Sequence, residues 1–302
     1  MEDRYFLSNG RTHNSRYCFN IHLPLECNPS PYPITLNERS MPVLRGKGRP
    51  LVLLIMLTAV ITIVITASVF SSWGQEQDHA QERETSRLLA ILFDSGRLVV
   101  GMNQELINDA SKGDKGFTSV VFEKQVLAVF EQRTGINLSN SNGQLPAMAR
   151  PLLDRLLEES KRTIQSYQTP INIAGISYKG LIPATFGTET AKRFQTWSGI
   201  YLRQIAPDKF LRNEKNKPDR YEADVLKALA EQASASGESQ FKWEITDGGN
   251  TLRLMLPLYY NKACLDCHGE PKGQRDITGY PREGGKEGEL GGAISVKLPL
   301  KQ

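Results

Sequence analysis

The longest uncharged stretch of the sequence predicts a membrane-anchored chain. The run from Leu51 to Phe70 holds no charged residue, and the uncharged interval between Arg49 and Glu76 is long enough to cross the hydrocarbon core as one helix. A cleaved signal peptide would have a shorter apolar region, with a small-residue cleavage site soon after it. We therefore predict a single transmembrane helix over residues 49–73.

Charges on the two sides of this run predict its orientation. Basic residues precede it and acidic residues follow it: Arg39, Arg45, Lys47 and Arg49 before, and Glu76, Asp78, Glu82 and Glu84 after. The positive-inside rule then places the N-terminus in the cytoplasm and the rest of the chain in the periplasm, as a single-pass protein of the inner (plasma) membrane. Residues 1–48 are polar without an apolar period, which predicts a disordered cytoplasmic tail. Met41 is an alternative translation start.

Composition allows a folded exocytoplasmic domain over residues 74–302. The chain has 302 residues, of which 39% are hydrophobic and 23% charged, as is usual for proteins with a packed core. Its net charge of +4 is small, and the basic cluster before the apolar run concerns the membrane. We expect no nucleic-acid partner and no enzymatic activity.

Periodicity predicts an α+β fold for this domain. Apolar residues at three- and four-residue steps predict a long helix from Glu76 to about Asn108, with Leu88, Leu92, Ser95, Val99, Met102 and Leu106 on one face. Further helices are predicted over about 118–133 and 147–165, from near Pro183, and from Asp219 to about 232. The pair Asp219 and Glu222 has the spacing of a capping box.

The last third of the chain alternates with period two, which predicts strands. Residues 241–245 and 252–256 flank the turn Asp247-Gly248-Gly249-Asn250, so they predict a hairpin with one buried face. Strands are also predicted over 200–205 and 292–298. These strands give an antiparallel sheet flanked by helices.

The hairpin leads directly to Cys264-Leu265-Asp266-Cys267-His268, the pattern of a covalent c-type haem attachment site. Each thiol can add to one haem vinyl group, and the imidazole that follows can reach the iron as its proximal ligand. A thiol redox pair and half of a zinc site are the alternatives. A zinc site is disfavoured because no second pair of ligands lies nearby. A redox pair is disfavoured because it usually opens a helix after a buried strand, whereas Gly269, Glu270 and Pro271 follow here in a Gly-rich loop.

These residues, taken with several other segments, resemble a known family. The matching segments are LIPATF (181–186), RNEKNKPDRYE (212–222), ACLDCHGEP (263–271), GYPREG (279–284) and GGAISVKLP (291–299). They resemble the Tll-type PAS-like c-type haem sensor domain, over about residues 80–300. The resemblance implies a PAS-like antiparallel sheet flanked by helices, with one covalent haem c held at the sheet edge by Cys264, Cys267 and His268.

The resemblance also raises the question of the sixth iron ligand. The family's best-described member uses a cysteine of its first long helix, whereas this chain has no cysteine between Cys27 and Cys264. Met102 is the soft ligand on the matching helix, so we predict it as a candidate haem and metal ligand. Met102 could instead pack in the hydrophobic core. The sixth position of the iron would then hold water or stay open to a small gas. His79, Met148 and Met255 are weaker candidates, and strand alternation places Met255 on the polar side of its strand.

The remaining haem contacts are predicted only as sets, each also explained by ordinary packing or solvation. Apolar walls are Val99, Met102, Trp243, Leu254 and Leu256, and propionate partners are Arg275, Tyr280, Arg282 and Lys286.

The sequence thus predicts a membrane-anchored sensor of redox state or of a small ligand. An electron-transfer cytochrome is the alternative, followed by a thiol-disulfide oxidoreductase. The chain ends at Gln302 after the last predicted strand, so we expect no output module in the same polypeptide. The expected partners are the membrane, a signalling or electron-transfer protein and, by analogy, a second copy of the chain bound through the helical stalk.

Overall fold

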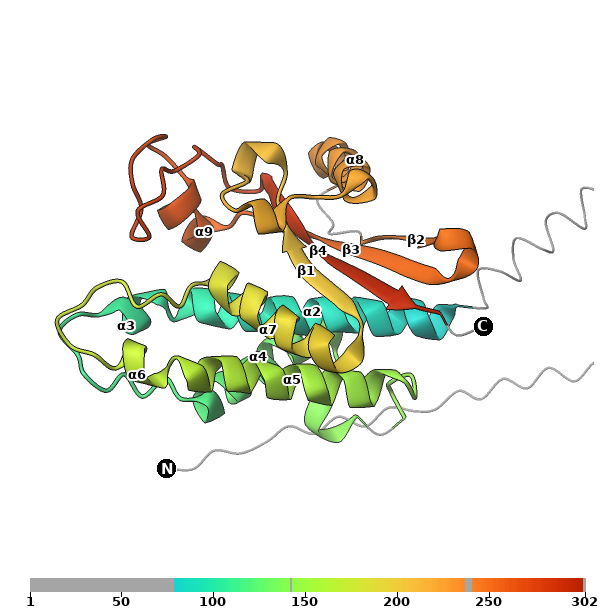
Figure 1. Ribbon diagram of the computed structural model, residues 1–302, viewed down its shortest axis with the longest axis horizontal. Coiled ribbons are helices and arrows are strands. Elements are labelled where there is room, and N and C mark those ends of the chain that lie inside the picture. Colours follow the sequence, from blue (N-terminus) through green and yellow to red (C-terminus); the bar gives the residue numbers. More distant parts are fainter. Residues whose placement is uncertain (1–78, 142, 237–240, 301–302) are drawn as a thin grey trace, which may run out of the picture. The chain divides into compact units, whose positions relative to one another are not determined.

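A computed structural model describes residues 79–141, 143–236 and 241–300, which form an α+β domain (Figure 1). The predicted tail, 1–48, and the predicted transmembrane helix, 49–73, lie outside the described residues. Among the helices that are described, none combines the length and the apolar character that a membrane span requires.

Most predicted elements are confirmed, with boundaries that differ by a few residues. The helices are α2 (Ala80–Met102), α3 (Gln104–Asn108), α4 (Ser119–Thr134), α5 (Ala149–Ser166), α6 (Gln168–Ile171), α7 (Pro183–Ser198), α8 (Arg220–Ser236) and α9 (Lys262–His268). The strands are β1 (Tyr201–Ile205), β2 (Lys242–Thr246), β3 (Thr251–Tyr259) and β4 (Leu290–Pro299).

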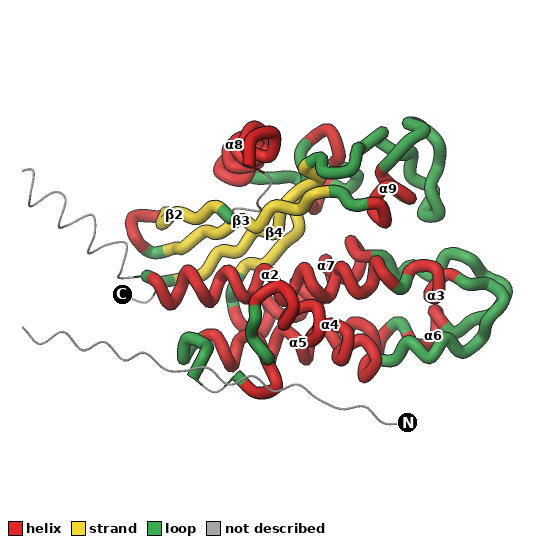
Figure 2. Tube along the Cα trace, turned by 180° about the vertical axis from the view of Figure 1, so that it is seen from behind, coloured by secondary structure: helices red, strands yellow, loops and turns green. Residues whose placement is uncertain are grey.

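The four strands form one antiparallel sheet in the order β1-β4-β3-β2. The helices α2 and α7 pack against one face of this sheet, and α4 and α5 pack on the far side of α2 (Figure 1). The opposite face is covered by α8, while α9 and the loop after it stand at one end of the sheet (Figure 2). This layering places the predicted haem-attachment segment beyond the end of β3.

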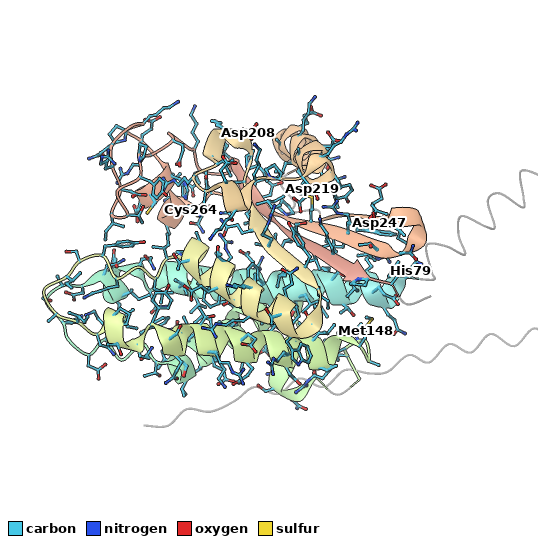
Figure 3. All side chains as sticks on the ribbon, viewed as in Figure 1. His79, Met148, Asp208, Asp219, Asp247 and Cys264 are labelled. Atoms are coloured by element: carbon cyan, nitrogen blue, oxygen red, sulfur yellow. The ribbon has the colours of Figure 1, made fainter. Side chains whose placement is uncertain are left out.

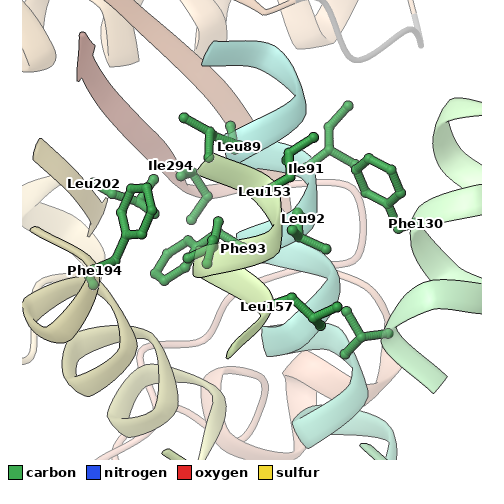
Figure 4. Packing of buried hydrophobic residues seen from close by; sticks show 14 of the residues in the cluster. Leu89, Ile91, Leu92, Phe93, Phe130, Leu153, Leu157, Phe194, Leu202 and Ile294 are labelled. Carbon is green, nitrogen blue, oxygen red and sulfur yellow. The ribbon is translucent and has the colours of Figure 1, made fainter. Parts of the chain in front are cut away.

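Helix α2 is the centre of the hydrophobic core. It lies between the sheet and the other helices, so Leu89, Ile91, Leu92 and Phe93 are all buried although they point in different directions (Figure 4). The predicted face is buried at Leu88, Leu92, Ser95 and Val99, and apolar residues on other sides of the helix are buried as well. A helix enclosed on nearly all sides buries apolar residues around most of its circumference.

The long first helix is also interrupted, contrary to the prediction that it runs unbroken to Asn108. It ends at Met102, and Asn103 separates α2 from α3. The Asn103 side-chain amide donates to the Val99 carbonyl at 2.8 Å and to Gln125 Oε1 at 2.8 Å, and such side-chain bonds compete with the helical ladder. Met102 is 62% exposed at this end, so its predicted place on the apolar face is wrong.

The hairpin prediction is correct in its strands and wrong in its single buried face. Met255, expected on the polar side, is fully buried in a second apolar cluster with Leu226 and Leu229 of α8. Because α8 covers the outer face of the sheet, both faces of β3 are buried. Nothing in the sequence before α8 indicates which face of the sheet this helix covers.

A polar network holds α8 on the sheet. The capping box is confirmed, since Asp219 N–H donates to Glu222 Oε2 and Glu222 N–H donates to Asp219 Oδ1, each at 2.9 Å. Glu222 is fully buried, and its Oε1 accepts from Ser295 at 2.7 Å and from Tyr201 at 3.1 Å. Arg253 Nη2 lies 3.3 Å from the same oxygen. The buried carboxylate is thus paired and fully hydrogen-bonded, as burial of charge requires.

Candidate functional site

The three predicted haem-attachment residues share one short helix, α9, which follows β3 (Figure 1). Asn261 caps this helix, because its side chain accepts from the Cys264 N–H at 3.2 Å. Cys264 and Cys267 are three residues apart, and His268 is four residues after Cys264, so all three lie on one helix face. Both cysteines are free thiols and half-buried. The structure therefore brings together the residues that the sequence predicts.

Glycines allow the chain to close tightly around the end of α9. Gly269 N–H donates to the Leu265 carbonyl at 2.8 Å, and a Cβ at position 269 would lie only 2.6 Å from that oxygen. Gly285 N–H donates to the His268 carbonyl at 2.7 Å, and a Cβ there would lie 2.7 Å from the Tyr260 ring. Neither position has room for a side chain.

The imidazole of His268 is fixed on two sides. The Tyr260 ring stacks on it with a centroid distance of 5.0 Å and an interplanar angle of 19°. Phe210 supports Tyr260 edge-on, at a centroid distance of 5.1 Å. On the ring edge, His268 Nδ1–H donates to Glu283 Oε2 at 2.9 Å. Since Nδ1 is engaged, Nε2 is the nitrogen left to bind a metal.

Arg212 joins three separate segments at this site. Its Nη2 donates to the Cys267 carbonyl at 2.6 Å, and its Nη1 donates to Asp276 Oδ2 at 2.6 Å. Its Nε and Nη2 both contact the Glu283 carboxylate, with Nη2 3.0 Å from Oε2. This is a bidentate pair of the kind that fixes orientation as well as charge.

The local charges keep the histidine neutral and its carboxylate partner ionised. Burial lowers the pKa of His268, Arg212 lowers it further, and Glu283 opposes both effects. Burial acts to raise the pKa of Glu283, but Arg212 and His268 outweigh it, so this pKa is below its usual value. A neutral imidazole with its second nitrogen bonded to a carboxylate is the form that ligates iron.

Cys267 has the properties of a protonated thiol. Burial raises its pKa to about 11, and the nearby Asp276 carboxylate adds to the shift. Reactive thiols of disulfide oxidoreductases have lowered pKa values, because the thiolate is the nucleophile. The environment of Cys267 therefore does not favour the thiol-exchange alternative.

The chemistry of these residues fits a c-type haem. Two thiols on one helix face suit two thioether bonds, and the oriented imidazole of His268 suits an axial position on the iron. Across the described ranges, no group of three or more His, Cys, Asp and Glu residues could hold a bare metal ion. A haem needs no such group, since the porphyrin itself supplies most of the iron ligands.

The other predicted ligands lie in different places. Met102 is exposed at the end of α2, the helix that packs against α9, so its ligation stays a prediction. His79 and Met148 lie at the opposite end of the domain from Cys264 (Figure 3), too distant to bind the same iron. Met255 is buried under α8, on the sheet face away from α2.

The predicted wall and propionate residues have mainly structural contacts. Val99, Leu254 and Leu256 belong to the main hydrophobic core, and Trp243 packs against it beneath Arg83. In the loop after α9, Arg275 donates to the Gly279 carbonyl and Arg282 to the Glu270 carbonyl.

Four side chains that position His268 have no role in the predictions made from the sequence. These are Arg212, Tyr260, Asp276 and Glu283. Arg212 and Glu283 do lie within two of the segments that carried the family resemblance, RNEKNKPDRYE and GYPREG, which is the one signal that pointed to them. Tyr178, before α7, also reaches the site, since Asp276 and Cys267 add to the burial that raises its pKa.

Comparisons with known proteins give one family. The family model described as Tll0287-like matches residues 147–299, which is half of the chain. Among solved structures, the "crystal structure of the cyanobacterial heme-protein Tll0287" matches with 19% identity and a TM-score of 0.35, covering 50% of this chain and 92% of that one. No curated protein matches the chain.

Proposed function

Because the chain belongs to the Tll0287-like family, we propose that it is a membrane-anchored, exocytoplasmic c-type haem protein with a PAS-like sensor domain. One haem c would be bound covalently by Cys264 and Cys267, with His268 as its proximal ligand. The family takes its name from Tll0287, which is described as a cyanobacterial heme-protein. The haem would supply a redox-active iron.

One observation carries this proposal: Cys264, Cys267 and His268 share a helix face, and Glu283 bonds His268 at Nδ1. The two thiols hold the cofactor in place. The Nδ1 bond fixes the tautomer, and Tyr260 fixes the ring plane, so His268 presents Nε2 in one orientation. Residues that serve only a disulfide exchange would have no need of this arrangement.

The position of α2 supports a sensing role. It packs against α9 at one end, and its other end reaches His79, next to the segment that leads to the predicted membrane span (Figure 3). A change of iron ligation at α9 would therefore act on a helix whose N-terminal end continues in the sequence into the predicted membrane span. The partner is proposed to be a signalling protein that responds to this helix.

A second candidate function is electron transfer. It is favoured by the fixed position of His268 between Tyr260 and Glu283, since a carrier keeps the same ligands in both oxidation states. The two functions differ in the expected response to reduction. A sensor changes the hydrogen-exchange protection of α2 on reduction or ligand binding, whereas a carrier does not.

The haem proposal is tested with the full chain, co-expressed with cytochrome maturation factors. We expect a Soret band that remains with the polypeptide after denaturation and acidic solvent extraction, because thioether bonds survive both treatments. Haem colour that is fully extracted, or a purified chain without a Soret band, would overturn the proposal.

The Met102 ligation proposal has its own test, a Met102→Ala variant. If the Met102 thioether binds the iron, its loss is expected to change the absorption spectrum of the reduced haem and to open a site for an added ligand such as carbon monoxide. Met148→Ala, at the opposite end of the domain, is the matched control. Identical spectra for the Met102→Ala variant and the parent chain in both oxidation states would exclude Met102.

A further inference from the structure

We propose that Arg212 is a positioning residue that acts on His268 through Glu283 and thereby lowers the reduction potential of the site. This inference rests on the proposed haem attachment and concerns a residue outside the attachment motif. Its basis is the contact geometry of Arg212, whose side chain is only 18% exposed.

All three nitrogens of the Arg212 guanidinium group are in use, and they connect segments far apart in the sequence. Nε and Nη2 hold the two oxygens of Glu283, Nη1 holds Asp276, and Nη2 also binds the Cys267 carbonyl. Arg212 therefore contacts both the helix that carries the ligand and the carboxylate that orients the ligand. No other described residue bonds both the Glu283 carboxylate and α9 apart from His268 itself.

A lysine could not replace this arrangement. The guanidinium group is a planar fork whose donors point in fixed directions, whereas an ammonium group is a point charge on a flexible stem. Lysine at position 212 would keep the positive charge beside the site, but it could not hold both Glu283 oxygens, Asp276 and the Cys267 carbonyl at once. Geometry and charge can thus be separated by substitution.

The expected direction of the effect follows from the Nδ1 hydrogen bond. A carboxylate that accepts the Nδ1 proton makes the imidazole a stronger electron donor, which stabilises the ferric state over the ferrous state. Loss of Glu283 positioning should therefore raise the potential. Removal of the Arg212 charge alone would act in the opposite direction, because less positive charge near the iron favours the ferric state.

The test compares midpoint potentials of the holoprotein, measured by spectroelectrochemistry. Mutation of a residue that hydrogen-bonds a metal ligand typically changes metal affinity ten- to a hundredfold. Each tenfold loss of preference for the ferric over the ferrous state raises a one-electron reduction potential by about 59 mV. We expect such a rise for Glu283→Gln, for Arg212→Gln and for Arg212→Lys. In a Glu283→Gln background, Arg212→Lys should add no further rise.

Several outcomes would overturn the positioning role. A lower potential in Arg212→Gln with an unchanged potential in Arg212→Lys would show that Arg212 acts by charge alone. A rise from Arg212→Lys that is fully additive with Glu283→Gln would show that Arg212 does not act through Glu283. The matched control is Arg150→Gln, an exposed arginine of α5 that pairs with Asp154 and lies two residues after Met148, at the opposite end of the domain from Cys264 (Figure 3), and it should leave the potential unchanged.

A measurement without haem separates this inference from the proposed function. In the chain produced without maturation factors, the His268 Nδ1 proton should be visible by NMR as a slowly exchanging signal. Both Arg212 variants should lose that signal, and Arg150→Gln should keep it. Retention of the signal in both Arg212 variants would overturn the inference, whereas a parent chain that never binds haem would overturn the proposed function alone.

Discussion

A chain in which serine replaces both Cys264 and Cys267 is expected to lose all haem that survives denaturation and solvent extraction. Serine hydroxyls do not add to haem vinyl groups under the conditions of cytochrome maturation, so no covalent bond remains. His268 alone could hold haem only by its bond to the iron, which breaks on unfolding. The measurement is haem staining of the denatured polypeptide together with its intact mass.

The N-terminal segment offers a matched control for this variant. Cys18→Ser with Cys27→Ser changes the same number of thiols outside the described residues, and it should leave covalent haem unchanged. A single substitution, Cys264→Ser, should retain one thioether and a shifted absorption band. Full retention of covalent haem by the Cys264→Ser/Cys267→Ser chain would contradict the assignment of these two residues.

Replacement of Glu222 by alanine is expected to destabilise the domain by about 3–5 kcal/mol, the usual cost of removing one partner from a buried ion pair. The fully buried carboxylate accepts from Ser295 and Tyr201 and lies beside Arg253, so its loss leaves a buried cation with one fewer partner. It also removes the capping bond to the Asp219 N–H at the start of α8. Urea unfolding of the purified chain, followed by tryptophan fluorescence, measures the change.

Glu231, on the exposed side of the same helix, provides the control. Glu231→Ala should change the free energy of unfolding by less than about 0.5 kcal/mol, as is usual for surface substitutions. Glu222→Gln keeps the shape and some hydrogen bonds, so its effect should lie between the two alanine variants. If Glu222→Ala and Glu231→Ala unfold at the same urea concentration, the network does not hold α8 on the sheet.

Local patterns in the sequence predicted local structure well. The helices α4, α5 and α7, the hairpin of β2 and β3, and the capping box of Asp219 and Glu222 all follow from contacts within a few residues. The haem-attachment residues could also be found, because all three lie within five consecutive positions of the chain, whereas the helix that carries them, α9, was not predicted. These features need no knowledge of distant partners.

Features set by distant contacts could not be predicted in the same way. Arg212 meets Glu283 across 71 positions of sequence, and the family resemblance of their two segments does not show that the two side chains are partners. Met255 was assigned to a polar face because the packing of α8 on that face cannot be read from strand alternation. Likewise, α2 is enclosed on nearly all sides, which depends on where α4, α5, α7, β3 and β4 pack.

The cover that α8 provides leaves the sheet with only its two edges open, and both edges resist pairing with another strand. The edge strands β1 and β2 are each five residues long. Arg203 of β1 donates to the Lys217 carbonyl, so the loop after Asn213 lies against that edge, and β2 carries the charged residues Lys242 and Glu244. Short, charged or covered edges prevent growth of a sheet between molecules. Two copies of this domain are therefore not expected to associate by joining their sheets edge to edge.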